Sequence, residues 1–371
     1  MWWGGSADYP GDHVGPGGFS AEAGVVPNPR VTLRDVARWA GVHPGTASRA
    51  LNVERRHLVK SETAERVLQA ARELQFRPDP AARSLKTRRS YTVGVLIPDL
   101  NNPLFPPIVR GIEDTLTPKG FVALMGNTDN DEERERRVFE GMRSRHVDGF
   151  IVATARQRHP LLDQAAAEEL PVVLVNRILD DNSLPSASVD DRMGAKLAVA
   201  HLIGLGHRRI AHIAGPQDVS TGRGRLHGFE AGMAAAGIPV DPRLVTYARG
   251  FTRAEGQRCL TELLAGGGDF TAVLAGNDLL ALGCYAALER AGLRCPEDVS
   301  VVGFNDMPFL DQLRPPLTSV RIPHYQIGAA AALLMLERIA DPRGPVDSKL
   351  LPPQLVVRGS TTAATREPGQ D

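Results

Sequence analysis

Apolar residues follow two different spacings along the chain. In residues 31–76 they recur at helical spacing in three short runs. The residues expected to cap or begin these runs are Thr32, His43-Pro44 and Ser61. From residue 91 onward, short apolar runs alternate with amphipathic helical stretches. The pattern therefore predicts a small all-helical domain followed by a larger α/β region.

Nine short apolar runs are the expected strands of the α/β region. They lie at residues 92–97, 122–125, 149–153, 172–175, 209–213, 244–247, 272–275, 300–304 and 319–322, and helical stretches such as 133–145, 192–205, 225–236 and 279–291 separate most of them. Strands that are apolar on both faces and linked by helices are typical of doubly wound parallel sheets. Nine strands favour two such sheets with a break near Asp190, and a ligand site between the two halves.

Charge is unevenly distributed along the chain. The 371 residues contain 43 Lys and Arg and 43 Asp and Glu, so the formal net charge is zero. Residues 31–90 nevertheless hold 13 basic and 6 acidic side chains. A compact basic head on an acidic body indicates a nucleic-acid-binding module, although a basic solvated face would carry the same charge.

Other features argue against several classes of protein. Three cysteines without paired spacing favour a reducing cytosol and no structural zinc, and we expect no metal or cofactor. No apolar run is long enough to span a membrane. Residues 1–30 are rich in Gly and Pro, do not resemble a signal peptide and are expected to be a disordered tail. The chain has no Walker A loop, no H-E-x-x-H and no G-x-S-x-G, so we expect neither catalytic residues nor an enzyme.

Residues 33–52 fit the steric requirements of a helix-turn-helix. This motif needs a small residue in its first helix and a residue that tolerates left-handed geometry at the turn, and Ala37 and Gly41 fill these positions. The expected apolar inner face consists of Val36, Ala40, Val42, Ala47 and Ala50. An ordinary helical hairpin is the alternative, but the basic charge favours DNA binding by the second helix.

The second helix is therefore the expected recognition helix. The candidate DNA contacts of this domain are Thr32, His43, Pro44, Gly45, Thr46, Ser48, Arg49 and Asn52. Arg49 suits a bidentate contact to a guanine, whereas the hydroxyls of Thr46 and Ser48 suit phosphates or secondary base contacts, and Asn52 suits the DNA backbone. The first two residues of the helix offer no side-chain hydrogen bond, so DNA shape is expected to contribute to recognition.

The chain resembles the lac repressor (LacI/GalR) family of bacterial transcription regulators over residues 31–360. The motifs that carry the resemblance, in one collinear order, are Val31-Thr-Leu-Arg-Asp-Val-Ala37, Ala47-Ser-Arg-Ala-Leu-Asn52, Ala82-Arg-Ser-Leu-Lys86, Gly204-Leu-Gly-His207, Asn277-Asp278, Ala281-Leu-Gly283 and Val299-Ser-Val-Val-Gly-Phe-Asn-Asp306. The resemblance implies an N-terminal helix-turn-helix domain and a periplasmic-binding-protein-like core of two doubly wound parallel-sheet subdomains. The expected boundaries are a DNA-binding domain at 31–78, a hinge at 79–90, a core at 91–360 and a frayed end at 361–371.

The resemblance also implies how the hinge works. In the family, the hinge becomes a helix only when two subunits bind an operator, and a leucine from each subunit wedges into the minor groove. The matching residue is Leu85, with Arg83 and Lys86 beside it for groove and phosphate contacts. An isolated hinge of this length is too short to be a stable helix in water. Packing of Leu85 on its own core is the alternative.

The positions that match the family's effector pocket are Asn101, Phe105, Asn176, Arg177, Arg225, Phe251, Asn277 and Asn305. Arg225 resembles the arginine that clamps polar effectors, and Phe251 resembles the aromatic platform of the pocket. Paired donors and acceptors beside an aromatic surface suit a sugar or sugar derivative.

Some of these positions have another interpretation or depart from the family pattern. Phe105 has a core position as its alternative, and Asn277 has a cap of the helix that begins at Asp278. Many relatives have Asp where this chain has Asn176 and Asn305. The missing carboxylates weaken the case for a cationic or strongly hydroxyl-donating effector.

The sequence predicts a DNA-binding transcriptional regulator, expected to be a repressor, that a sugar-like effector controls through the arrangement of two subunits. The expected partners are double-stranded operator DNA, a small-molecule effector and a second copy of the chain, since no leucine heptad for a tetramer follows residue 360. The expected location is the bacterial cytoplasm. A solute-binding protein without a DNA-binding role is the alternative, which the basic head and the lack of an export signal disfavour.

Overall fold

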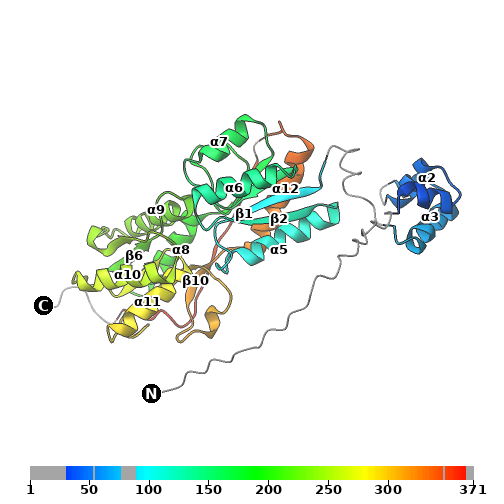
Figure 1. The fold of residues 1–371 in the computed structure, drawn as a ribbon. Coiled ribbons are helices and arrows are strands. Elements are labelled where there is room, and N and C mark those ends of the chain that lie inside the picture. The colour runs from blue at the N-terminus through cyan, green and yellow to red at the C-terminus, as the bar shows by residue number, and fades with distance from the viewer. Residues whose placement is uncertain (1–30, 53–54, 77–88, 346, 365–371) are drawn as a thin grey trace, which may run out of the picture. The chain divides into compact units, whose positions relative to one another are not determined.

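The structure is a computed structural model that describes residues 31–364 apart from 53–54, 77–88 and 346. The chain divides into two compact units, residues 1–82 and residues 83–371. Each unit is described by itself (Figure 1). The domain boundaries near residues 30, 78 and 90 stay predictions.

The first unit is all-helical, as predicted. Its elements are α1 (Leu33–Trp39), α2 (Pro44–Leu51), a 3-10 turn η1 (Arg56–Leu58) and α3 (Ser61–Glu73). Thr32 caps α1 as expected, in a reciprocal capping box with Asp35. The prediction that Ser61 caps α3 is wrong: Lys60 occupies the capping position without a side-chain hydrogen bond. Ser61 is the first residue of the helix, and its hydroxyl contacts Glu65 one turn later.

Small side chains build the core of the first unit. Its buried members are Val36, Ala37, Ala40, Ala47, Ala50, Ala64, Val67, Ala70 and Ala71. Alanine side chains let the three helices approach closely. All five predicted inner-face residues from Val36 to Ala50 belong to this cluster or pack on its edge, and Gly41 has the expected left-handed φ of 64°. The prediction of a helix-turn-helix is therefore confirmed.

The second unit has two lobes, each built on a six-stranded sheet (Figure 1). The strands of the first sheet, in spatial order, are β11 (Ser348–Leu351), β5 (Ser186–Val189), β4 (Val172–Val175), β3 (Gly149–Val152), β1 (Thr92–Ile97) and β2 (Val122–Asn127). All of its strand pairs are parallel. The doubly wound parallel architecture predicted for this lobe is confirmed.

Helices cover both faces of the first sheet (Figure 1). Residues of α5 (Phe105–Leu116) and α12 (His324–Ala340) share a core cluster with Val93, Val95 and Ile97 of β1, whereas Leu96 packs with α6 (Glu132–Arg143) and α7 (Pro160–Ala167). This alternation follows from the two-residue period of a strand. The α5 and α12 backbones meet at Gly111, where a Cβ atom would lie 2.1 Å from the Tyr325 carbonyl oxygen. Glycine is therefore required there.

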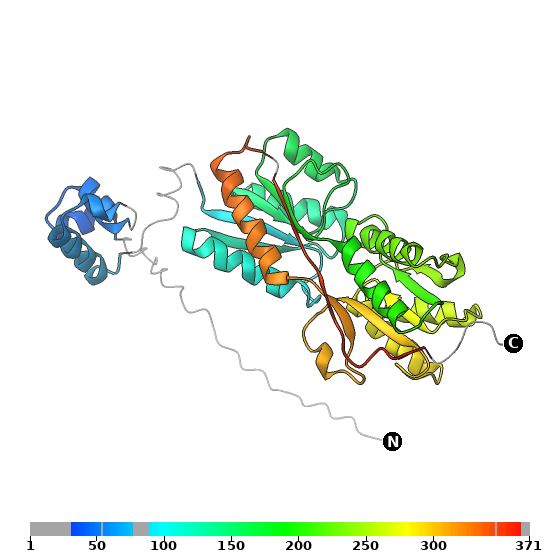
Figure 2. The ribbon, with the colours of Figure 1, turned by 180° about the vertical axis from the view of Figure 1, so that it is seen from behind.

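The second lobe repeats this plan with one antiparallel edge. Its strands, in spatial order, are β12 (Gln354–Val356), β10 (Thr318–Arg321), β9 (Ser300–Asn305), β8 (Ala272–Ala275), β6 (Ile210–Ala214) and β7 (Val245–Tyr247). Only β12 runs antiparallel, along β10. The helices α8 (Asp191–Gly204) and α9 (Ser220–Ala235) lie on one face, and α10 (Arg253–Ala265) and α11 (Asp278–Arg290) lie on the other (Figure 2).

The chain passes between the lobes three times, whereas the sequence predicted one break near Asp190. The first passage lies between β5 and α8, as predicted; the others lie between β10 and α12 and between β11 and β12 (Figure 2). The strands β5, β11 and β12 were not predicted. In β5 the buried residues include Ser186 and Ser188, and the backbone N–H of Ser186 donates to the Ser348 hydroxyl at 3.1 Å. A strand with alternate serines has no apolar run to reveal it.

The segment after β12 packs on the second lobe as far as residue 364, whereas it was expected to fray from residue 361. Residues 361–371 were expected to fray, but Thr362 N–H donates to the Ser300 hydroxyl at 3.1 Å and Ala364 N–H donates to the Leu205 carbonyl at 2.9 Å. The His201 ring contacts the Thr361 hydroxyl at 3.0 Å. The expectation is therefore wrong for residues 361–364, and residues 365–371 lie outside the described part. No helix within the described ranges is long and apolar enough to cross a membrane.

Candidate functional site

The helix α2 is fixed from its inner side and from its start. Ala47 and Ala50 are fully buried against the rest of the first unit. Pro44 occupies the first helical turn, where a missing N–H costs nothing. His43 caps the helix, and its Nδ1 atom accepts a hydrogen bond from Gly45 N–H at 3.1 Å. The capping role explains His43 without DNA, so its proposed DNA contact stays a prediction.

The outer side of α2 presents polar side chains to solvent. Arg49 and Asn52 are exposed, and Thr46 and Ser48 are half-buried. Asn52 ends the helix, with its Oδ1 atom accepting from Arg55 N–H at 3.3 Å. The Arg49 guanidinium has no hydrogen bond or ion pair with any other described residue. A free, exposed guanidinium on a small helix is the arrangement that bidentate base recognition needs.

The structure does not test two parts of the predicted DNA surface, Thr32 and the hinge. The Thr32 hydroxyl donates to the Asp35 carboxylate at 2.6 Å, so Thr32 already has a role in the capping box. The hinge residues Arg83, Leu85 and Lys86 lie outside the described residues. Their predicted contacts with the minor groove therefore stay predictions.

In the second unit, Arg225 of α9 lies at the centre of a buried polar cluster. Its side chain is 3% exposed. The Nε atom donates to Asp191 Oδ1 at 2.8 Å, Nη1 donates to the Gly276 carbonyl at 2.7 Å, and Nη2 donates to Asn305 Oδ1 at 3.2 Å. The guanidinium thus joins the start of α8 to the carboxyl ends of β8 and β9. The other two N–H groups of the guanidinium have no acceptor among the described residues.

Two aromatic rings flank the Arg225 guanidinium. Its carbon lies 3.9 Å from the centroid of Phe304 and 5.7 Å from the centroid of Phe251. The Phe251 ring lies against Gly215, where a Cβ atom would come within 2.4 Å of it. The structure therefore brings together three predicted effector residues: Arg225, Phe251 and Asn305.

Asp191 and Phe304 belong to this cluster but were not predicted as site residues. Burial raises the pKa of Asp191 to about 6, against the opposing effect of Arg225. Asp278, next to the predicted Asn277, is fully buried; it accepts from the Ser319 hydroxyl at 2.5 Å and from Met307 N–H at 2.9 Å. Burial raises the pKa of Asp278 to about 7. The Asp190-Asp191 pair at the predicted break was the only sequence signal for the Arg225 partner.

Asn176 and Arg177 lie where the two lobes meet. Asn176 follows β4 with a left-handed φ of 66°, and its buried Oδ1 atom has no hydrogen-bond partner among the described residues. Arg177 is buried, and burial lowers its pKa to about 10. The next residue, Ile178, donates its N–H to the Ser220 hydroxyl of α9 at 3.0 Å. We call residues 176–178 and 218–221 the lobe junction.

The remaining predicted effector residues lie elsewhere or have a structural role. Asn277 caps α11, accepting from Leu280 N–H at 2.9 Å, as the alternative interpretation held. Asn101 is exposed in the loop before α5. Phe105 is 1% exposed in the core of the first lobe. An effector contact by any of the three stays a prediction.

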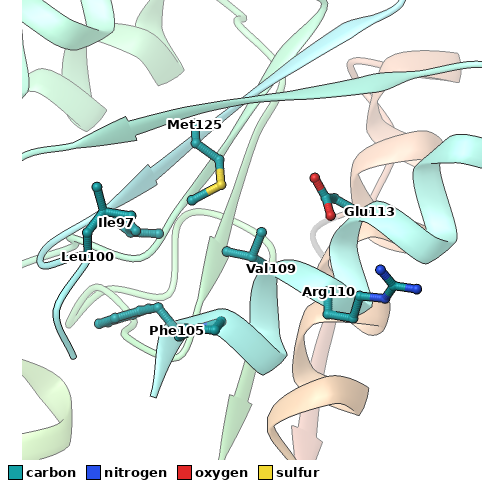
Figure 3. Close-up of a pocket in the computed structure, with 8 residues that line it drawn as sticks. Ile97, Leu100, Phe105, Val109, Arg110, Glu113 and Met125 are labelled. Atoms are coloured by element: carbon teal, nitrogen blue, oxygen red, sulfur yellow. The ribbon is translucent and has the colours of Figure 1, made fainter. Parts of the chain in front are cut away.

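Phe105 also lines a pocket of about 250 Å³ on the first lobe. Figure 3 shows its ring facing Ile97, Leu100 and Val109, with Met125 on the opposite side. Most of these lining side chains are apolar. They come from β1, the loop after it, α5 and β2 of the first lobe, so this pocket is separate from the polar cluster around Arg225 in the second lobe.

A helix-turn-helix joined to a two-lobed α/β unit with a buried polar centre defines a ligand-responsive DNA-binding regulator. Comparison with family models agrees: residues 32–79 match the bacterial regulatory proteins of the lacI family, and residues 199–361 match a periplasmic binding protein-like domain. The chain is 34% identical over 334 residues to the HTH-type transcriptional repressor CytR of Escherichia coli K12, which covers 90% of this chain and 96% of CytR. The chain belongs to the lacI family of bacterial regulatory proteins.

Solved structures show the same architecture. The transcriptional regulator CelR in complex with cellobiose aligns with a TM-score of 0.69 and 33% identity, covering 89% of this chain and 100% of CelR. The lac repressor dimer bound to operator and the anti-inducer ONPF aligns with a TM-score of 0.77 and 28% identity, covering 90% of this chain and 100% of the lac repressor chain. The predicted family and fold class are therefore confirmed.

Proposed function

We propose that this protein is a transcriptional repressor that binds operator DNA as a homodimer. A sugar or sugar derivative that binds between its two lobes controls its affinity for the operator. The observation that carries the DNA-binding part is that Arg49 is exposed on the outer face of α2 and has no hydrogen bond or ion pair with another described residue. The relatives support the rest: CytR is a repressor, CelR was solved with cellobiose, and the lac repressor was solved as a dimer on its operator. We place its action in the bacterial cytoplasm, where operator DNA is found.

The polar cluster supports the effector part of the proposal. Arg225 joins the start of α8 to the ends of β8 and β9, beside the Phe251 ring. Two free guanidinium donors next to an aromatic face suit the hydroxyl groups and the apolar face of a sugar ring. An effector that binds one arrangement of the lobes more tightly shifts the population toward it.

In this proposal, the hinge couples effector binding to operator affinity. We propose that Leu85 of each subunit wedges into the minor groove, while Arg83 and Lys86 contact phosphates. Replacing Leu85 with Ala removes the wedge and keeps the charges. We therefore expect a large loss of operator affinity and a small loss of affinity for random duplex at the same salt. Equal losses on both duplexes would rule out the wedge.

The proposed function has a direct test. Purified full-length protein is incubated with sheared genomic DNA, and the recovered fragments are sequenced and used in mobility-shift titrations. We expect a short, twofold-symmetric site that is bound at least 1,000-fold more tightly than random duplex at physiological salt. No enriched site, with or without a panel of sugars, would refute a DNA-binding role.

A further inference from the structure

We propose that the effector carries an anionic group, a carboxylate or a phosphate, and that Arg177 binds this group at the amino-terminal end of α9. The proposal rests on the proposed function, since it describes the ligand of the same site. It adds a chemical class, an acid form of a polyhydroxylated molecule, and assigns a specific residue to the acid group.

Arg177 differs from three other arginines around the lobe junction because it has no partner among the residues that the structure describes. Arg225 is paired with Asp191, Arg156 with Glu132 and Asp218, and Arg223 with Asp180. Arg177 is only 8% exposed, yet no hydrogen bond or ion pair joins its guanidinium to any residue that the structure describes. Burying most of an arginine side chain without a protein partner has a desolvation cost, which a bound anion would offset.

The acidic groups nearest Arg177 are already engaged. Asp218 and Glu135 both act on the Arg177 charge. Asp218, however, pairs with Arg156 at 3.8 Å. The buried Glu135 lies 3.4 Å from the His159 ring and accepts a hydrogen bond from the Thr154 hydroxyl. No described carboxylate of the protein is therefore within ion-pair distance of Arg177, so an anion from outside would be its first direct partner.

The amino-terminal end of α9 adds to the attraction for an anion. This helix has 16 residues, and its capping residue Val219 supplies no side-chain hydrogen bond. The Ser220 hydroxyl oxygen accepts a hydrogen bond from Ile178 N–H. The Thr221 side chain is 2% exposed, and its hydroxyl has no partner among the described residues. An uncapped helix start with a buried, unused hydroxyl offers donors and a positive dipole end to an anion.

The neighbouring residue indicates that the ligand also donates hydrogen bonds. Asn176 is 4% exposed, and its Oδ1 atom lacks a donor among the described residues. An amide oxygen cannot satisfy an anion, but it accepts from a hydroxyl group. An acceptor directly before an unpaired arginine therefore fits a molecule with both hydroxyl and acid groups, such as a sugar acid or a sugar phosphate.

The first test uses small anions, which need no knowledge of the effector. Thermal unfolding of the full-length protein is measured in sodium phosphate, sodium acetate and sodium chloride at equal ionic strength. We expect phosphate or acetate, at about ten times its Kd, to raise the midpoint by about 2–4 °C over chloride. The Arg177→Gln variant should lose this difference, and Arg223→Gln should keep it, because Arg223 is already paired with Asp180.

The first test also accounts for anions that bind the basic head, because these stabilise the wild type and the Arg177→Gln variant equally. Only the difference between those two proteins counts. An equal rise in both, or no rise in the wild type, overturns the proposal. Operator binding is measured in parallel, and Arg177→Gln should still bind operator. Failure of the wild type to bind any operator is thus a separate result, which affects the proposed function.

The second test separates the two acid groups. Affinities are measured by calorimetry for matched sets: glucose, glucuronate and glucose 6-phosphate, and ribose, ribonate and ribose 5-phosphate. We expect an acid member to bind at least tenfold more tightly than its neutral partner, and the preferred acid identifies carboxylate or phosphate. Arg177→Gln should remove that tenfold preference. Binding of a neutral sugar as tight as that of both its acids overturns the proposal.

Discussion

Arg49 in the first unit and Arg225 in the second are the same residue type in opposite surroundings. Arg49 lies exposed on α2, with no hydrogen bond or ion pair to another described residue. Arg225 is 3% exposed and donates to Asp191, Gly276 and Asn305. The free guanidinium has its donors available for DNA, whereas the buried one uses most of its donors to hold the second lobe together. Removing the first should therefore affect binding alone, and removing the second should affect folding.

The largest expected effect is at Arg225. Replacing it with Met keeps most of its volume but leaves the Asp191 carboxylate buried without its partner. We expect the free energy of unfolding of the second unit to fall by about 3–5 kcal/mol. Urea unfolding followed by circular dichroism measures this loss.

A double variant provides the control for Arg225. Replacing Arg225 with Met and Asp191 with Leu removes both charges, so we expect much of the lost stability to return. A single Arg225→Met variant that loses less than about 1 kcal/mol would contradict a structural role, because a buried pair costs more than that to break. Arg225 would then resemble Arg49, because its main role would be to bind a ligand and not to stabilise the fold.

The second effect concerns pH and distinguishes the two units again. His212 of β6 is fully buried, stacked on Phe229, and its Nδ1 atom contacts the Leu274 carbonyl at 2.8 Å. Burial lowers the pKa of His212 from 6.5 to about 4. The folded protein therefore excludes a proton that the unfolded chain accepts. This contribution to stability is complete above pH 6.5 and is lost as the pH falls toward 4.

The pH effect can be measured as a slope. Between pH 6.5 and 4, His212 lowers the free energy of unfolding by about 3 kcal/mol. The His212→Asn variant keeps a side-chain N–H near the Nδ1 position but cannot take up the proton. We therefore expect its stability to fall less steeply than that of the wild type between pH 6.5 and 4. Parallel slopes for the two proteins would show that His212 does not control acid unfolding. Both described histidines of the first unit, His43 and His57, are exposed.

The third effect is at Arg49 itself. Replacing it with Ala should cost about 1–3 kcal/mol of operator affinity and relax the base preference at one position. Selection of binding sites from a randomised pool measures the preference, and calorimetry should show unchanged stability. Arg66, exposed on α3, is the matched control. Its replacement by Ala should leave every base preference intact, and an Arg49 variant that behaves in the same way would remove Arg49 from base recognition.

Local patterns predicted most of the fold. The bounds of β1, β4 and β8 agree with the apolar runs at 92–97, 172–175 and 272–275, since each is buried on both faces. The strand β5 has no such run, because its buried Ser186 uses Ser348, a residue 162 positions away, as a partner. A partner at that distance leaves no periodic signal.

The effector site was predicted less completely than the fold, because its residues also find their partners far away in the sequence. Resemblance to a family pointed to Arg225, Phe251 and Asn305, which the structure brings together. Asp191 was missed because its ion pair with Arg225 exists only after α8 and α9 pack. Residue type alone did not distinguish Arg177, which has no partner among the described residues, from Arg225, which is paired with Asp191. Such differences arise from tertiary packing, and the sequence carries them only indirectly.

The smallest expected effect is at the turn between α1 and α2. Gly41 has a φ of 64°, and a Cβ atom placed there would meet nothing within 4 Å. Replacing Gly41 with Ala therefore costs only the strain of left-handed backbone, about 1 kcal/mol. The Gly41→Asn variant should lose less, because Asn tolerates this conformation. Tryptophan fluorescence during urea unfolding measures both losses when Trp2 and Trp3 are replaced by Phe in all proteins compared, since Trp39 of α1 is then the only tryptophan of the chain. Equal losses for the two variants would mean that the backbone conformation of the turn is not what requires glycine. In contrast to Arg225, the expected cost at Gly41 involves no lost contact, so it should leave the unfolding of the second unit unchanged.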